Sequence, residues 1–135
     1  MLRLAVVSGA WELRGGAVGP DVVWRRGPDE RTARAAGFTG PSPAYDVVVA
    51  RRLALPVGQV RRLRLVEVTE PVLATRTVEV QWARAPDTQG TERYDVTDLA
   101  TGERRVVHLL DDLVVDRLVD LDTSASGLAG LDGQP

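Results

Sequence analysis

Apolar and polar residues alternate along two stretches of the chain, residues 45 to 55 and residues 72 to 84. In the later stretch every second residue is apolar apart from Arg76, and these apolar positions are Val72, Ala74, Val78, Val80 and Trp82. In the earlier stretch only Arg51 interrupts the apolar side, which carries Tyr45, Val47, Val49, Leu53 and Leu55. A period of two is typical of a β-strand with one buried face, so both stretches are predicted to be strands.

Residues 59 to 69 also have the pattern of a strand, but their apolar side changes partway along. Leu63 and Leu65 lie on one side, whereas Val66 and Val68 lie on the other. An extra residue inserted into one strand of a pair moves the side chains that follow it to the opposite face. The pattern therefore predicts a β-bulge near Leu65.

The clearest hairpin joins residues 92 to 96 to residues 103 to 110. The intervening loop, Asp98 to Gly102, ends in a glycine, which adopts a positive φ at little cost. Pro86 to Gly90 has the composition of a further turn, so residues 72 to 110 are predicted to form a meander of three strands. Shorter strands are predicted near the start of the chain, at 2 to 7, 10 to 14 and 21 to 25, with turns at Ser8-Gly9 and Gly15-Gly16.

One short helix is predicted between Pro28 and Gly37. Proline suits the first position of a helix, Asp29 and Glu30 complement its positive end, and Gly37 can end it. The sequence Gly-Pro-Ser-Pro at 40 to 43 then predicts an extended connection into the strand that starts at Tyr45.

Residues 111 to 121 fit both a helix and a strand. In a helix, Asp112, Asp116 and Asp120 would repel one another at a spacing of four, so a strand is the prediction. Residues 122 to 135 are rich in glycine and serine, which predicts a flexible C-terminal tail that orders only against a partner. The expected organisation is one β domain over 1 to 121 followed by this tail.

The composition agrees with a single domain: the chain has 135 residues, of which 44% are apolar. Several short strands with one minor helix predict an all-β fold, a single-domain sandwich or small barrel with one short helix. Cysteine is absent, which excludes disulfides and thiolate metal sites, and all 17 basic residues are arginine. Lysine, isoleucine and asparagine all use AT-rich codons, so their absence indicates a GC-rich genome such as that of an actinobacterium or its phage.

Charge is divided unevenly along the chain. Residues 1 to 64 contain 11 arginines and five acidic residues, whereas residues 65 to 135 contain six arginines and 14 acidic residues. The two halves therefore carry net charges of +6 and −8, and either they pair within one subunit or they leave a dipolar surface that docks on a neighbour. For docking, the interface candidates are Arg51, Arg52, Arg61, Arg62 and Arg64 on the basic side and Asp111, Asp112, Asp116, Asp120 and Asp122 on the acidic side. The docking interpretation predicts head-to-tail association of subunits.

The sequence contains few candidate catalytic or metal-binding residues. The single histidine, His108, lies in an apolar strand without an evident carboxylate to orient it, so no catalytic residue is predicted. A calcium-loop pattern at Asp120 to Leu131 fails because alanine replaces the required glycine and leucine replaces the required glutamate. No cofactor and no metal are expected.

The expected function is that of a non-enzymatic interaction protein, a homo-oligomer or a component of a larger assembly such as a phage head, connector or tail. The alternative from another class is a β-barrel that binds a small molecule, including an isomerase or cyclase, with Tyr45 and His108 as polar contacts. A cavity of roughly 300 Å³ or more with convergent polar groups would favour that alternative. A nucleic-acid-binding β domain is a further alternative, weakened by the acidic balance and the few aromatic residues. No stretch resembles a signal peptide or a membrane span, so a cytoplasmic protein without membrane partners is expected, or a virion component if a phage encodes it.

Overall fold

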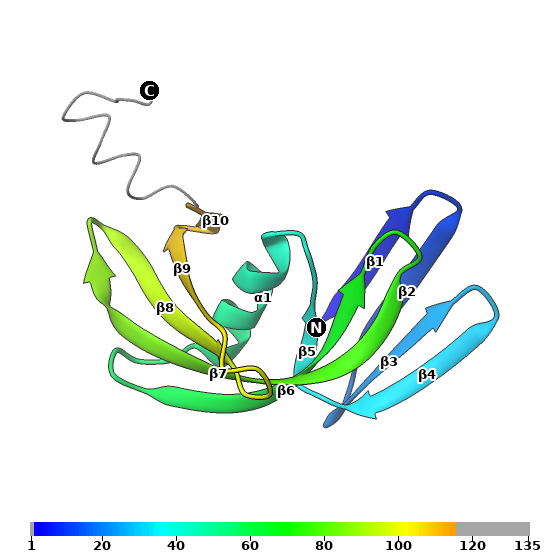
Figure 1. The fold of residues 1–135 in the computed structure, drawn as a ribbon, viewed down its shortest axis with the longest axis horizontal. Coiled ribbons are helices and arrows are strands. Elements are labelled where there is room, and N and C mark those ends of the chain that lie inside the picture. The colour runs from blue at the N-terminus through cyan, green and yellow to red at the C-terminus, as the bar shows by residue number, and fades with distance from the viewer. Residues whose placement is uncertain (1, 116–135) are drawn as a thin grey trace.

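The computed structural model describes residues 2 to 115, which form two β-sheets and one helix (Figure 1). The first sheet is an antiparallel meander in chain order, made of β1 (Arg3–Ser8), β2 (Trp11–Val18), β3 (Asp21–Arg26) and β4 (Asp29–Arg34). The second sheet has the strand order β10-β9-β8-β7-β6-β5. Its strands are β5 (Gly37–Thr39), β6 (Val60–Thr69), β7 (Ala74–Thr88), β8 (Thr91–Asp98), β9 (Arg104–Leu110) and β10 (Leu113–Val114). The helix, α1 (Ala44–Leu53), connects β5 to β6.

The sheets curve around α1 as a half-barrel, so the all-β fold with one short helix is confirmed (Figure 1). The predicted meander is also confirmed, as β7, β8 and β9 pair in antiparallel succession. The β8–β9 turn has the expected chemistry: the Asp98 carboxylate accepts hydrogen bonds from the backbone of Ala100 and Thr101, and Gly102 has a φ of 78°. β10 is the described part of the strand predicted over 111 to 121, whereas the tail at 122 to 135 lies outside the described residues.

Residues 44 to 53 form α1, so the strand predicted over 45 to 55 is wrong. Tyr45, Val49 and Leu53 are four residues apart, so they share a face in a helix as well as in a strand. The polar ends of α1 complement its dipole, with Asp46 in the first turn and two arginines in the last. Burial of the Val49 face against the second sheet then selects the helix over the strand.

The helix predicted over 28 to 37 is also wrong, because this segment forms β4 and the start of β5. Gly27, with a φ of 60°, makes the β3–β4 turn together with Pro28, and the β4 backbone then pairs with β3 along its whole length. Thr32 adds a hydrogen bond from its hydroxyl to the Val22 carbonyl at 3.2 Å. Pairing with β3 satisfies the backbone hydrogen-bonding groups of β4, and this outweighs the weak local preference of these residues for a helix.

Two finer predictions need correction. Gly15 and Gly16 lie inside β2, paired with Trp24 and Val23, and the turn that follows β2 is at Gly19-Pro20 instead. The predicted bulge near Leu65 is absent, because β6 pairs with β7 without any shift of register. The apolar side changes because the two parts of β6 are buried on opposite faces, one beneath α1 and the other beneath the first sheet.

Two apolar cores result. The first lies between α1 and the concave face of the second sheet, and it contains Val49, Ala50, Leu65, Val80, Trp82 and Tyr94 among others. The second joins the two sheets, and it contains Leu13, Val22, Trp24, Phe38, Val66 and Val68 among others. Trp82 is 1% exposed, so its predicted position on a buried face is confirmed. Within residues 2 to 115, no helix has both the length and the apolar character needed to cross a membrane.

Candidate functional site

A pocket of about 490 Å³ opens between the start of α1 and the concave face of the second sheet. Its floor is apolar and consists of Val78, Val80, Val96 and Val114. Ionisable side chains surround this floor and come from α1, β6, β8, β9 and the β8–β9 turn: Asp46, Glu67, Asp98, Glu103, Arg104 and Arg105. The pocket therefore combines an apolar surface with convergent polar groups, and we call it the concave pocket.

A bidentate ion pair between α1 and β9 fixes one side of the concave pocket. The Arg105 guanidinium donates to both carboxylate oxygens of Asp46, at 2.7 and 2.9 Å. The Asp46 side chain is only 15% exposed, so this pair is better shielded from solvent than an ordinary surface pair. The paired geometry restricts both side chains and holds the first turn of α1 against the sheet.

The remaining acidic groups give the concave pocket an excess of negative charge. Glu67 accepts a hydrogen bond from the exposed Arg76 at 2.6 Å, and the Asp98 carboxylate caps the β8–β9 turn. Within the described residues, the Glu103 and Arg104 side chains form no ion pair of their own. Once Arg105 neutralises Asp46 and Arg76 neutralises Glu67, two carboxylates, those of Asp98 and Glu103, face the one guanidinium of Arg104.

A second polar cluster holds the other end of α1. Arg51 donates to Glu92 at 2.9 Å, to Asp112 at 2.9 Å and to the backbone carbonyl of Asp111, and the buried Tyr94 hydroxyl donates to Glu92 at 2.7 Å. The hydrogen bond from Arg51 lowers the pKa of Glu92, whereas burial and then this carboxylate raise the pKa of Tyr94. The helix is thus fixed to the sheet at both ends, which gives the concave pocket a rigid wall.

A second groove of about 490 Å³ lies along β6 and between the two sheets, and it is basic. Its charged lining consists of Arg34, Arg52, Arg62, Arg64 and Glu79. Arg64 is bound to Glu79 at 2.9 Å, and Arg34 lies 3.8 Å from Asp21 outside the groove. We call this feature the basic groove.

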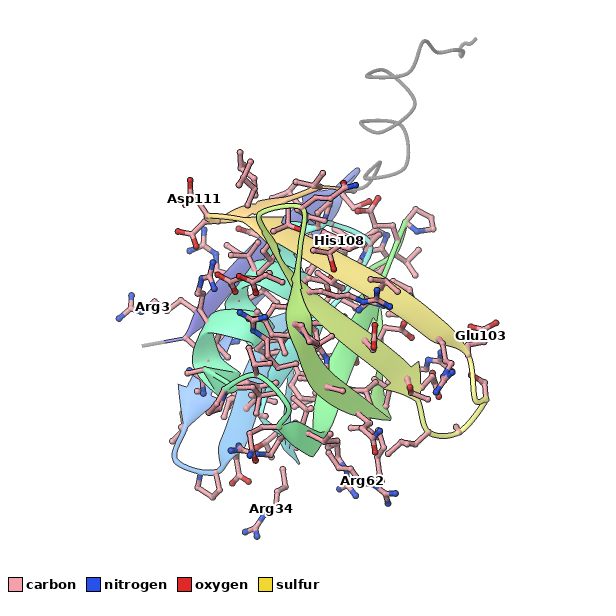
Figure 2. All side chains as sticks on the ribbon, turned by 90° about the vertical axis from the view of Figure 1, so that its left-hand side faces the viewer. Arg3, Arg34, Arg62, Glu103, His108 and Asp111 are labelled. Carbon is pink, nitrogen blue, oxygen red and sulfur yellow. The ribbon has the colours of Figure 1, made fainter. Side chains whose placement is uncertain are left out.

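The charged residues singled out in the sequence divide between these places. The basic groove brings Arg52, Arg62 and Arg64 together, and Arg61 lines a smaller pocket that adjoins it. Arg51 instead binds Asp112 of the same chain, so these two candidates meet inside one subunit. Figure 2 shows Arg34 and Arg62 at one end of the molecule and Asp111 at the opposite end. Asp116, Asp120 and Asp122 lie outside the described residues.

Tyr45 and His108 do not line the concave pocket. The Tyr45 ring packs over Gly40 and against the second core, and burial raises the pKa of its hydroxyl with a smaller contribution from Glu70. His108 lies on the convex side of β9 with its Nδ1 3.3 Å from the Thr91 hydroxyl oxygen, while Val107 and Leu109 on either side of it enter the first core. Neither residue is placed to contact a ligand in this pocket.

His108 predicts a measurable pH dependence of stability. Burial, and then the positive charge of Arg93, lower the pKa of His108 below its ordinary value of 6.5, while Asp95 opposes them. The folded state therefore favours the neutral ring, so unfolding takes up a proton once the pH falls below about 6.5. We expect the melting temperature to be lower at pH 5.5 than at pH 7.5, and the His108→Gln variant to lose most of this difference. Because the chain has one histidine, an equal decrease in both proteins would contradict the assignment.

Sequence reasoning missed the residues that shape the concave pocket. The period of two around Asp46 predicts a strand, and Arg105 is one of two adjacent arginines without any motif around them. Their pairing joins positions 59 residues apart, and no local spacing predicts such a contact. Among residues 2 to 115, no three acidic or histidine side chains are grouped so that they could hold a metal ion.

Comparison with known proteins identifies a solved structure with a similar fold. No protein-family model matches the sequence, and no curated protein matches it. The crystal structure of a DUF1089 family protein from Pseudomonas aeruginosa matches with a TM-score of 0.54 and 16% sequence identity. The match covers 84% of this chain and 80% of that protein. At this identity the likeness supports the half-barrel architecture.

Proposed function

We propose that the protein binds a small molecule in the concave pocket, and that the ligand is an amphiphilic cation. The observation that carries the proposal is the pocket of about 490 Å³ in the hollow of the half-barrel, with its valine floor and its ionisable rim. This volume lies within the range of roughly 300 to 1,000 Å³ that is common for ligand sites. It also meets the size expected of a small-molecule-binding β protein.

The valine floor determines where the apolar part of the ligand lies. Val80 and Val96 are only 8% and 4% exposed, so the accessible apolar surface of the floor belongs mainly to the half-buried Val78 and Val114. Covering this surface with a hydrocarbon chain removes apolar area from water, which is worth about 25 cal/mol for each Å². A chain or ring of five to seven carbons suits a site of this kind.

The rim determines the charge of the ligand. With Asp46 held by Arg105 and Glu67 held by Arg76, the groups that remain are Asp98 and Glu103 against Arg104. An ammonium group at the rim gains attraction from these carboxylates, whereas a carboxylate group at the same place is repelled. The proposed ligand therefore has an apolar body on the floor and a positive group at the rim.

Matched probes test the charge preference. Hexylamine and hexanoate have chains of the same length and opposite charges, so thermal denaturation with each compound separates charge from hydrophobic contact. Hexylamine is expected to raise the melting temperature in a concentration-dependent way, because ligand bound to the folded state stabilises it by mass action. Hexanoate is expected to raise it less at every concentration.

Charge reversal at the rim supplies the control. In the Glu103→Arg variant the affinity for hexylamine should decrease by about two- to fivefold, the size expected of one exposed charge pair. The Glu12→Arg variant has the same change of charge on β2, outside the concave pocket, and should leave the affinity unchanged. Equal binding of hexylamine and hexanoate, or equal effects of the two variants, would refute the proposed ligand class.

A further inference from the structure

The first half of β6 has an open edge. β5 is short and pairs only with Leu65 to Glu67, so residues 60 to 64 have no strand on the side away from β7. The Ala36 amide donates to the Arg64 carbonyl at 2.8 Å, which shows that the backbone of Arg64 points towards this open side. Backbone direction alternates along a strand, so the amide and carbonyl of Arg62 also point there. The open edge can accept one more strand.

Side chains of opposite character flank this edge. On one face of β6 lie Arg62 and Arg64, which belong to the basic groove together with Arg34 and Arg52. Within the described residues, Arg52 and Arg62 form no ion pair. On the other face lies a pocket of about 220 Å³ that is apolar apart from Arg52 and Arg61 at its edge, with a lining that includes Phe38, Val48, Val49, Leu53, Leu63 and Leu65. A strand added here would fit best with acidic side chains on one face and apolar side chains on the other.

The chain itself contains a segment with this pattern. Between 116 and 122, the even positions are Asp116, Leu118, Asp120 and Asp122, and the odd positions are Arg117, Val119 and Leu121. In an extended conformation the three aspartates would share one face with Leu118, and Val119 and Leu121 would share the other with Arg117. We refer to residues 116 to 122 as the acidic segment.

We propose that the acidic segment of one copy of this protein docks as an added strand on the β6 edge of a second copy. The aspartates then face the basic groove, and Val119 and Leu121 face the apolar pocket beside Leu63. Backbone hydrogen bonds to the open edge supply affinity, and the alternating side chains supply the register. This site is separate from the concave pocket and does not depend on the ligand proposed for it.

Geometry favours a second copy over the chain's own segment. Asp111 lies at the opposite end of the molecule from Arg34 and Arg62, so a copy stacked end to end brings this end against the Arg34 and Arg62 of another copy (Figure 2). Because the two surfaces differ, the contact is head to tail and leads to a ring or a filament.

Sedimentation of the full chain over a range of concentrations tests this proposal. In 50 mM salt we expect the average mass to exceed that of the monomer and to increase with concentration, and we expect 1 M salt to weaken the association at least tenfold. The double variant Arg52→Glu/Arg62→Glu should weaken association at least tenfold in low salt. Mixing it with Asp120→Arg/Asp122→Arg should restore association, because one mixed contact pairs a reversed groove with a reversed segment and the other pairs a native groove with a native segment.

Matched controls separate this interface from general charge effects. Arg25→Glu/Arg31→Glu has the same change of charge on β3 and β4, outside the basic groove, and should leave association unchanged. Val119→Ser should weaken association more than Leu118→Ser, because only residue 119 lies on the apolar face of the added strand. Circular dichroism of each variant verifies that its fold is retained.

Three results would overturn the proposal. One is a monomer at every concentration and salt condition, and another is equal weakening by the groove and control variants. The third is that the full chain stays monomeric but binds a fluorescent single-stranded DNA of 20 bases, and that the groove variant loses this binding. The basic groove would then be a nucleic-acid-binding site.

Discussion

Replacing Trp82 with alanine is expected to remove about 3 to 5 kcal/mol from the free energy of unfolding. The side chain is 1% exposed, lies under α1 in the first core, and contacts the Tyr94 ring with 5.4 Å between ring centroids. Its loss leaves a cavity that the surrounding strands cannot close. Because domains of this size have total stabilities of about 5 to 15 kcal/mol, the variant should denature at a much lower urea concentration.

The same substitution at Trp11 is the matched control. Trp11 is 40% exposed, and its ring contacts the Arg26 guanidinium at 4.6 Å from the ring centroid. Losing this cation–π contact should cost only about 0.5 to 1 kcal/mol. Similar losses in the two variants would mean that the first core is not the main source of stability.

Gly15→Ala is expected to destabilise the protein by about 1 to 3 kcal/mol, although it adds a single methyl group. A Cβ at this position would lie 2.8 Å from Cζ of the Phe38 ring and 3.0 Å from both Cβ of Trp24 and the Val23 carbonyl oxygen. Trp24 and Phe38 are buried against each other in an edge-to-face arrangement, so neither can yield without disturbing the second core. The glycine therefore allows β2 and β3 to approach the Phe38 ring.

Gly37→Ala provides the comparison for this prediction. Gly37 is also a strand glycine, but its added Cβ would meet only Leu2 at 3.6 Å and Leu65 at 3.9 Å, which are ordinary contacts. We expect a change of at most about 1 kcal/mol, in either direction. A larger loss in Gly37→Ala than in Gly15→Ala, measured by urea denaturation, would contradict the packing described for Gly15.

The candidate sites show where sequence reasoning reaches its limit. The division of charge along the chain singled out Arg52, Arg62 and Arg64, and the structure brings these three residues together in the basic groove. The division of charge did not predict that Arg51 would bind Glu92 and Asp112 of the same chain. The concave pocket was also not predictable, since Asp46 and Arg105 meet only after α1 has packed on the second sheet.

The sequence by itself determined the β-rich fold class and the meander of β7, β8 and β9. In these strands the period of two is unbroken around Val80 and Trp82, and Asp98 and Gly102 provide turn chemistry that acts within five residues. Only the tertiary structure decided the conformation of α1 and β4. The spacing of Tyr45, Val49 and Leu53 fits both a helix and a strand, and burial against the second sheet selected the helix. The mostly exposed residues of β4 have only a weak local preference for a helix, and pairing with β3 selected the strand.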